Sequence, residues 1–161
     1  MILLDGKATA QSIRQEIAEA SRGVQKRHGR PPGLAVVLAG EDPASQVYVR
    51  NKEKACQEAG VKSFAHRLPA DVSQDKLLGL IDDLAASDEV DGVLVQLPLP
   101  EGLAPQACLE RIPPSKDVDG FHPENMGRLA MGLPGLRPCT PAGVMALLQR
   151  HGVDPAGKRA V

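Results

Sequence analysis

The run Gly33-Leu-Ala-Val-Val-Leu-Ala39 is a continuous aliphatic stretch, as expected for a β-strand that is covered on both faces. A second run of the same character is Gly92-Val-Leu-Val-Gln96. Strands buried on both faces occur mainly in parallel sheets that carry helices on either side. We therefore predict an α/β fold, a three-layer sandwich around a mostly parallel sheet.

The segments around these two runs alternate between helical and extended patterns. Apolar residues at Ile13, Ile17 and Val24 recur at helical spacing, for example, before a break at Gly29. We expect helices over residues 7–27, 45–59, 74–86, 105–110 and 141–150, and a further strand over residues 62–68. Ser45, Ser73 and Thr140 are the expected N-caps, because a hydroxyl can accept from an unpaired amide of the first turn. In a sheet of this kind the functional groups lie beyond the carboxyl ends of the strands.

Composition limits the classes of partner. The net charge is −1 over 161 residues, with no block of like charges that would follow nucleic acid or an anionic membrane. Aromatic residues make up 2% of the chain, so platforms for stacking single-stranded bases are scarce. No apolar run approaches the length of a membrane span. We expect a cytoplasmic protein with neither nucleic acid nor membrane as a partner.

Cysteine and histidine spacing predicts no metal site. The three cysteines are far apart and form no CxxC pair, and the four histidines never stand at ligand spacing. The segment Asp117-Val-Asp-Gly120 resembles the start of a calcium loop, but its glycine falls at the wrong position. Two interpretations remain for Asp119 from the residues alone: a carboxylate that accepts from a ligand's ring nitrogens, or a plain Asx-turn before Gly120.

Two further features have both a functional and a structural interpretation. Tyr48 and Lys52 are four residues apart, which places them on one face of the expected helix. They could face a ligand, or they could belong to a solvated face and a packing contact, which the spacing alone favours. Gln96 directly follows a buried strand, where its side chain would either reach a ligand crevice or simply end the strand. Pro98 and Pro100 would hold that turn rigid.

A third feature is a partial phosphate-binding motif. Gly152-Val-Asp-Pro-Ala-Gly157-Lys158 has the spacing of its first seven positions. Arg159 replaces the required Ser or Thr, and Pro155 lacks one of the amides that would hold a phosphate. We interpret the segment as a connection from a helix to a following strand, which would begin near residue 157.

Four blocks of the sequence, taken together, resemble a known family. They are Ser45-Gln-Val-Tyr48-Val-Arg-Asn-Lys52-Glu-Lys54; Val93-Leu-Val-Gln96-Leu-Pro98-Leu-Pro100; Pro114-Ser-Lys-Asp-Val-Asp119-Gly-Phe-His-Pro-Glu-Asn125-Met-Gly127-Arg128-Leu129; and Arg137-Pro-Cys139-Thr140-Pro141. In this order they resemble the FolD family of bifunctional methylenetetrahydrofolate dehydrogenases and methenyltetrahydrofolate cyclohydrolases. The likeness extends over essentially the whole chain.

The resemblance implies roles for five residues. It places the catalytic lysine of the family on Lys52, its assisting glutamine on Gln96 and its ring-stacking tyrosine on Tyr48. Substrate binding would involve these three with Pro98, which lines the folate pocket, and Asp119, which binds the pterin. The implied reactions are oxidation of 5,10-methylenetetrahydrofolate to the methenyl compound and hydrolysis of the latter to 10-formyltetrahydrofolate, within one-carbon metabolism and purine biosynthesis.

The resemblance also implies a second domain. Family members continue into a Rossmann domain that binds NADP, or NAD in some members, and they are commonly dimers through it. We therefore expect residues 1–150 to form the folate-binding catalytic domain, and residues 151–161 to form a linker and the start of the nucleotide-binding domain. On this expectation the chain has no cofactor-binding residue of its own, no dehydrogenase activity, and a monomeric state. Two alternatives remain for it: a cyclohydrolase-bearing domain, or a folate-binding module without turnover.

Overall fold

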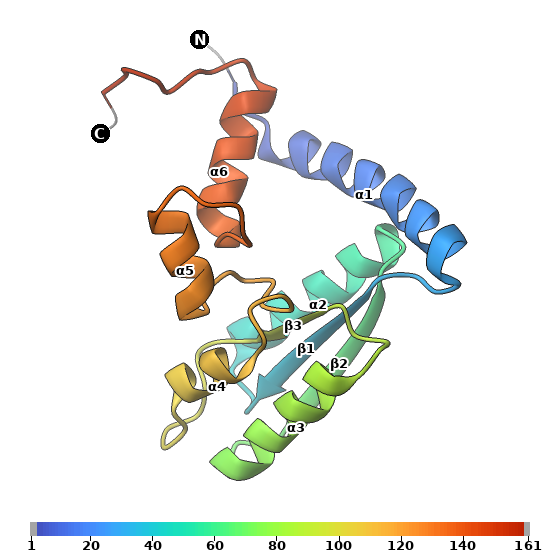
Figure 1. The fold of residues 1–161 in the computed structure, drawn as a ribbon, viewed down its shortest axis with the longest axis vertical. Coiled ribbons are helices and arrows are strands. Elements are labelled where there is room, and N and C mark those ends of the chain that lie inside the picture. Colours follow the sequence, from blue (N-terminus) through green and yellow to red (C-terminus); the bar gives the residue numbers. More distant parts are fainter. Residues whose placement is uncertain (1–2, 160–161) are drawn as a thin grey trace.

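The computed structural model describes residues 3–159 and contains a parallel sheet of three strands in the order β2-β1-β3. The strands are β1 (Gly33–Ala39), β2 (Lys62–Leu68) and β3 (Gly92–Val95), with β1 at the centre. Helices lie against both faces of the sheet (Figure 1). The predicted α/β sandwich with a parallel sheet is therefore confirmed.

The central strand separates two apolar clusters because successive side chains point to opposite faces. Ala35 and Val37 pack toward α3 (Gln74–Ala86) and α4 (Pro105–Arg111). Val36 and Leu38 pack with Leu94 toward α2 (Pro43–Glu58) on the other face. All residues of β1 except Leu34 are buried, which is why the strand reads as a continuous aliphatic run.

The remaining helices lie outside this sandwich. Helix α1 (Gly6–His28) packs on α2, and α6 (Cys139–Arg150) lies beside α1 at the end of the molecule away from α3 (Figure 1). Helix α5 (Pro123–Ala130) connects the sheet side to α6. Within residues 3–159 no helix combines the length and the apolar character needed to cross a membrane.

Two predicted helix starts are wrong. Helix α2 begins at Pro43, because the Asp42 carboxylate accepts from the amide of Ser45 at 2.7 Å and thereby caps the helix three residues before the predicted cap Ser45. Helix α6 begins at Cys139, so Thr140 lies inside its first turn and is not the N-cap. Ser73 is the N-cap of α3 as predicted.

Helix α5 was not predicted at all. It starts at Pro123, a favourable residue for a first helical position, and the imidazole of His122 accepts from the amide of Glu124 at 3.1 Å. Its two turns are too short for a clear apolar period. The strand expected to begin near residue 157 falls partly on residues 160 and 161, which lie outside the described part of the chain.

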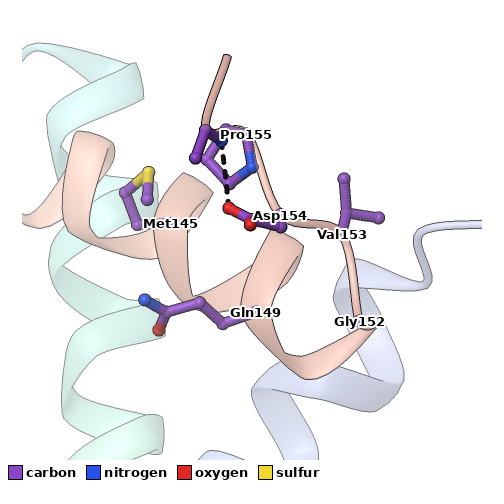
Figure 2. Close-up of a pocket in the computed structure, with 7 residues that line it drawn as sticks. Met145, Gln149, Gly152, Val153, Asp154 and Pro155 are labelled. Carbon is purple, nitrogen blue, oxygen red and sulfur yellow. Dashed lines mark hydrogen bonds between the residues drawn. The ribbon is translucent and has the colours of Figure 1, made fainter. Parts of the chain in front are cut away.

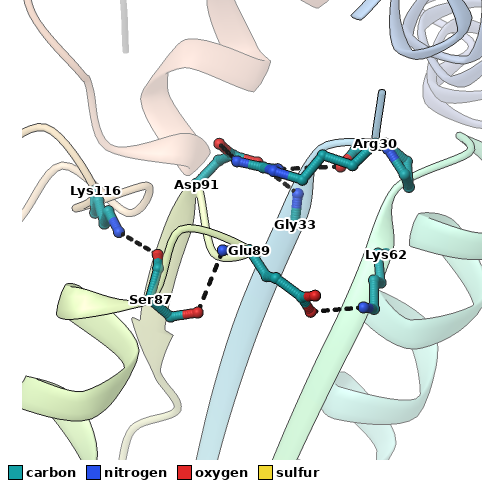
Figure 3. A network of polar contacts seen from close by, with 8 residues as sticks. Arg30, Gly33, Lys62, Ser87, Glu89, Asp91 and Lys116 are labelled. Carbon is teal, nitrogen blue, oxygen red and sulfur yellow. Dashed lines mark hydrogen bonds and ion pairs between the residues drawn. The ribbon is translucent and has the colours of Figure 1, made fainter. Parts of the chain in front are cut away.

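A polar network fixes the amino ends of the strands (Figure 3). Arg30 binds the carboxylate of Asp91 through two bonds of 2.7 and 2.9 Å, and the amide of Gly33 donates to the same carboxylate at 2.7 Å. The Arg30 hydrogen bond is the main reason that the pKa of Asp91 falls to about 2. Lys62 pairs with Glu89 at 2.7 Å nearby. This network ties β1, β2 and the start of β3 together at the edge opposite their carboxyl ends.

Candidate functional site

Helix α2 and strand β3 bring Lys52 and Gln96 into contact. The Lys52 amine donates to the Gln96 side-chain oxygen at 2.8 Å. Because α2 follows β1 and β3 lies beside β1 in the sheet, the third turn of α2 passes the carboxyl end of β3. The Gln96 amide nitrogen donates to the carbonyl of Leu97 at 2.8 Å, so both ends of its side chain are engaged. The direct hydrogen-bond partner of the Lys52 amine is therefore the oxygen of an uncharged amide.

Tyr48 and Pro98 lie at the surface around this pair. Tyr48 is one turn before Lys52 on α2 and is 61% exposed, so its ring is accessible to a ligand. Pro98 follows a cis peptide bond from Leu97 and is also exposed. Pro98 lies just beyond the carboxyl end of β3, and Tyr48 lies on α2, one turn before Lys52.

Lys52 also lines a largely apolar cavity of about 460 Å³. It lies between α1, α2 and the sheet, and Asp119 and Cys139 line it together with Lys52. Of the predicted site residues, Lys52 and Asp119 are on its wall, whereas Tyr48, Gln96 and Pro98 are not. Lys52 thus stands between two environments, the cavity and the Gln96 side chain.

The carboxylate of Asp119 is held in an unfavourable environment for its charge. Burial raises its pKa above the ordinary value, and the nearby carboxylate of Asp117 adds to that rise. The charge of Lys52 and the nearby Cys139 thiol act in the opposite direction. The pKa of the Cys139 thiol is raised as well, by partial burial of the sulfur in an otherwise exposed residue and by the negative charge of Asp119. Lys52, Asp119 and Cys139 therefore form one electrostatically connected group.

Cys139 is a site residue that sequence reasoning missed. Its thiol lies 3.5 Å from the carbonyl oxygen of Val118, next to Asp119, although 21 positions separate it from Val118 in the sequence. No spacing rule for cysteines predicts such a position. Its place directly before Thr140 in the fourth block that resembles the family is the only signal that could have indicated it.

The segment with the partial phosphate-binding motif does not have the geometry of that motif. A phosphate-binding loop follows a strand, whereas residues 152–158 follow helix α6. The side chain of Asp154 accepts from the amide of Ala156 at 3.0 Å, so this amide is already engaged (Figure 2). Met145 and Gln149 of α6 line a surface cavity of about 600 Å³ with this segment. Within residues 3–159 no cluster of three metal-ligating side chains occurs either.

Comparison with known proteins identifies relatives over the whole chain. Residues 4–119 match the family described as tetrahydrofolate dehydrogenase/cyclohydrolase, catalytic domain. The bifunctional protein FolD of Nitratidesulfovibrio vulgaris (strain DSM 19637 / Miyazaki F) is 65% identical over 161 residues, which are 100% of this chain and 56% of that protein. The bifunctional protein FolD of Neisseria gonorrhoeae (strain NCCP11945) is 58% identical over 159 residues, 99% of this chain and 56% of that protein.

Solved structures agree with these relatives. The bifunctional FolD enzyme of Campylobacter jejuni superposes with a TM-score of 0.95 at 48% identity, covering 98% of this chain and 56% of that one. The Trypanosoma brucei enzyme, solved with NADP cofactor and inhibitor, gives a TM-score of 0.92 at 37% identity, covering 99% of this chain and 54% of that one. The chain therefore spans slightly more than half the length of the proteins that it matches.

Proposed function

The chain belongs to the tetrahydrofolate dehydrogenase/cyclohydrolase family, and we propose that it carries the folate site and the cyclohydrolase chemistry of that family. The observation that supports this most directly is the 2.8 Å contact between the Lys52 amine and the Gln96 side-chain oxygen. It joins two side chains that are 44 positions apart, beyond the carboxyl end of a parallel strand, where sites of this fold lie. Folate derivatives are the proposed ligands.

The proposed roles follow from the chemistry of each side chain. Tyr48 offers an accessible aromatic face on which the aminobenzoyl ring can stack. Asp119, when ionised, can accept from the amino group and the ring N–H of the pterin together. Pro98 would bound the pocket on the side of the turn after β3. These three residues hold the substrate while Lys52 and Gln96 act on its one-carbon unit.

Hydrolysis needs a group that takes a proton from water. Water adds to the methenyl carbon, and in the fraction of molecules in which the Lys52 amine is uncharged, this amine accepts the proton that the water loses. The hydroxyl of this adduct then loses its proton as the carbon–oxygen double bond of the formyl group forms and the carbon–nitrogen bond to N5 breaks. N5 takes up a proton, and 10-formyltetrahydrofolate results. Gln96 accepts a hydrogen bond from the Lys52 amine and so orients it without placing a full negative charge beside it. A carboxylate at position 96 would add that charge.

The dehydrogenase reaction is proposed for the whole protein and not for these 161 residues. It requires NADP, or NAD in some members, as hydride acceptor, and the described residues contain no phosphate-binding loop at residues 152–158. We propose that residues 1–150 are the folate-binding catalytic domain, and that residues 151–161 lead toward the part of the relatives that holds the nucleotide. We propose that the whole protein is cytoplasmic and homodimeric, and that the 161-residue chain is monomeric.

Hydrolysis of methenyltetrahydrofolate, followed by its absorbance, tests the proposal. We expect the chain to accelerate hydrolysis and Lys52→Met to abolish the acceleration, with Lys54→Met as the matched control. Lys54 lies two residues further along α2 and is exposed, so its loss should leave the rate unchanged. Equal rates for the chain and for Lys52→Met would contradict a catalytic role.

The alternative is a folate-binding module without turnover. Calorimetric titration with tetrahydrofolate separates it from the enzyme, because the module binds folate and shows no rate that depends on Lys52. Absence of tetrahydrofolate binding would contradict both.

A further inference from the structure

Asp117 is a buried carboxylate to which the proposed mechanism assigns no role. Its residue is only 1% exposed, although burying a charged side chain without compensation costs considerable free energy. One carboxylate oxygen accepts from the amide of His122 and from the side-chain nitrogen of Asn125, both at 2.8 Å. The charge of Asp117 is therefore compensated within one loop.

Asn125 links Asp117 to the start of the same loop. It is 4% exposed, and the same nitrogen that binds Asp117 also donates to the carbonyl of Pro114 at 2.9 Å. The loop from Pro114 to Asn125 is thus closed across 11 positions through two buried polar side chains. Helix α5, which contains Asn125, is attached to the edge of the sheet by these bonds.

The residues on both sides of Asp119 are fixed as well. The amide of Val93 donates to the carbonyl of Lys116 at 2.8 Å, which joins the loop to β3. Val118 packs into the apolar cluster on the α2 face. Gly120 has a φ of 67°, and an added Cβ would lie 2.5 Å from the carbonyl carbon of Arg137. The backbone before and after Asp119 therefore has little freedom.

We propose that Asp117 is a positioning residue for Asp119: its bonds to His122 and Asn125 fix the loop so that the Asp119 carboxylate meets the pterin. This inference rests on the proposed function, since it takes the pterin as the ligand of Asp119. Asp117 itself does not contact the ligand. It acts through the backbone that it shares with Asp119.

The charge of Asp117 does not favour the ionised form of Asp119, so the proposed role of Asp117 is to hold the loop in place through hydrogen bonds. The carboxylate of Asp117 lies close enough to raise the pKa of Asp119, so the two acids repel each other. An apolar side chain at position 117 would leave the amide of His122 and the side-chain nitrogen of Asn125 without this acceptor. What an apolar side chain cannot do is accept the two hydrogen bonds that close the loop.

Two substitutions at position 117 separate the hydrogen bonds from the charge. Asp117→Asn keeps an oxygen that can accept both bonds, whereas Asp117→Ala removes them. Binding of tetrahydrofolate is measured by calorimetry and compared with binding of p-aminobenzoylglutamate, which has no pterin. We expect Asp117→Ala to weaken tetrahydrofolate about tenfold, Asp117→Asn to stay within about twofold of the original chain, and p-aminobenzoylglutamate affinity to change in neither.

A double-mutant cycle shows whether Asp117 acts through Asp119. We expect Asp119→Ala to weaken tetrahydrofolate about tenfold, and the double variant Asp117→Ala/Asp119→Ala to lose no more than Asp119→Ala alone. Circular dichroism verifies that each variant is folded. If Asp117→Ala does not fold, Asn125→Ala takes its place in the cycle, because it removes one donor and leaves Asp117 in place.

The outcomes distinguish this inference from the proposed function. If Asp119→Ala weakens tetrahydrofolate binding and Asp117→Ala does not, the positioning role is overturned and the proposed function stands. Losses that multiply in the double variant, or equal losses for both ligands, would also overturn it. If the original chain does not bind tetrahydrofolate, the proposed function and this inference both fail.

Discussion

Asp119 combines a proposed binding role with an environment that disfavours its charge. Burial first, and the neighbouring carboxylate of Asp117 second, raise its pKa above 3.8. The folded chain therefore takes up a proton at Asp119 more readily than the unfolded chain does. Relative to the unfolded state, the ionised carboxylate costs stability at every pH above its raised pKa, and the cost disappears as the pH falls toward 3.8.

This sign leads to a prediction for Asp119→Asn. We expect the variant to unfold at a higher temperature than the original chain at pH 7, because the amide carries no charge to desolvate. The difference should shrink as the pH is lowered toward 3.8, where the original carboxyl becomes neutral as well. Thermal unfolding followed by circular dichroism at several pH values measures both trends.

Asp91→Asn is the control with the opposite sign. The pKa of Asp91 is lowered to about 2, so this variant should unfold at a lower temperature at pH 7. A drop in stability for Asp119→Asn at pH 7 would mean that the attraction of Lys52 exceeds the cost of burial. Asp119→Asn should also bind tetrahydrofolate less well than the original chain, since it loses the ionised carboxylate that accepts from the pterin.

For single residues, the sequence alone could predict only part of the site. The spacing of Tyr48 and Lys52 places them on one helix face, but no local pattern shows that Lys52 reaches Gln96, 44 positions away. The resemblance of the four blocks to a family supplied that pairing. It did not indicate Asp117 as a separate residue of interest, because its burial depends on α5, a helix too short to show a period.

Elements were easier to predict where burial dominates. The bounds of β1 and β2 are as predicted, since the aliphatic run of β1 and the turns at its ends leave little choice. Helix starts were harder, because neighbouring polar side chains offer alternative caps at different positions. Asp42 caps α2 in place of Ser45, and α6 starts before Thr140.

The amino ends of the strands offer a prediction at the scale of elements. Asp91→Ala removes the partner of Arg30 and leaves the buried amide of Gly33 without its acceptor. The ion pair is largely exposed and screened, so most of the expected loss, about 1 kcal/mol, comes from the amide. For a chain of this length this corresponds to roughly 2–4 °C in the unfolding temperature.

Glu89→Ala is the matched control in the same network (Figure 3). It removes an exposed pair with Lys62 and no bond to a strand amide, so a smaller loss is expected. Equal losses in the two variants would show that the Gly33 bond contributes nothing. The contribution of Asp91 should also fade as the pH is lowered from 3.8 toward about 2, because its pKa is depressed in the folded chain.

The whole molecule divides into a tightly packed sandwich and a helical part around α6. Helix α3 and strand β1 each contain fully buried residues, for example Leu77, Ile81 and Ala35. Helix α6 contains no buried residue. Large apolar side chains on α5, α6 and the segment between them are exposed, among them Met131, Leu136 and Val144. Few buried apolar contacts hold α6, so its attachment depends more on polar bonds than that of α3 does.

A two-bonded ion pair joins α6 to α1. Arg150 binds the carboxylate of Glu16 through two bonds of 2.6 and 2.7 Å. The hydrogen bond from Arg150 is the main cause that lowers the pKa of Glu16 from 4.5 to about 2. The pair therefore stabilises the folded chain above pH 4.5, and this contribution is lost as the pH falls toward about 2.

We predict that Glu16→Gln loosens α6 without affecting the sandwich. Hydrogen exchange should become faster at the amides of α6 and stay unchanged at those of α3, and 0.5 M salt should have the same effect on the original chain because the pair is exposed. Arg111→Gln is the control: it breaks the pair with Asp82, which joins α4 to α3, and should leave α6 unchanged. Faster exchange throughout the chain in Glu16→Gln would instead show that α6 and the sandwich unfold as one unit.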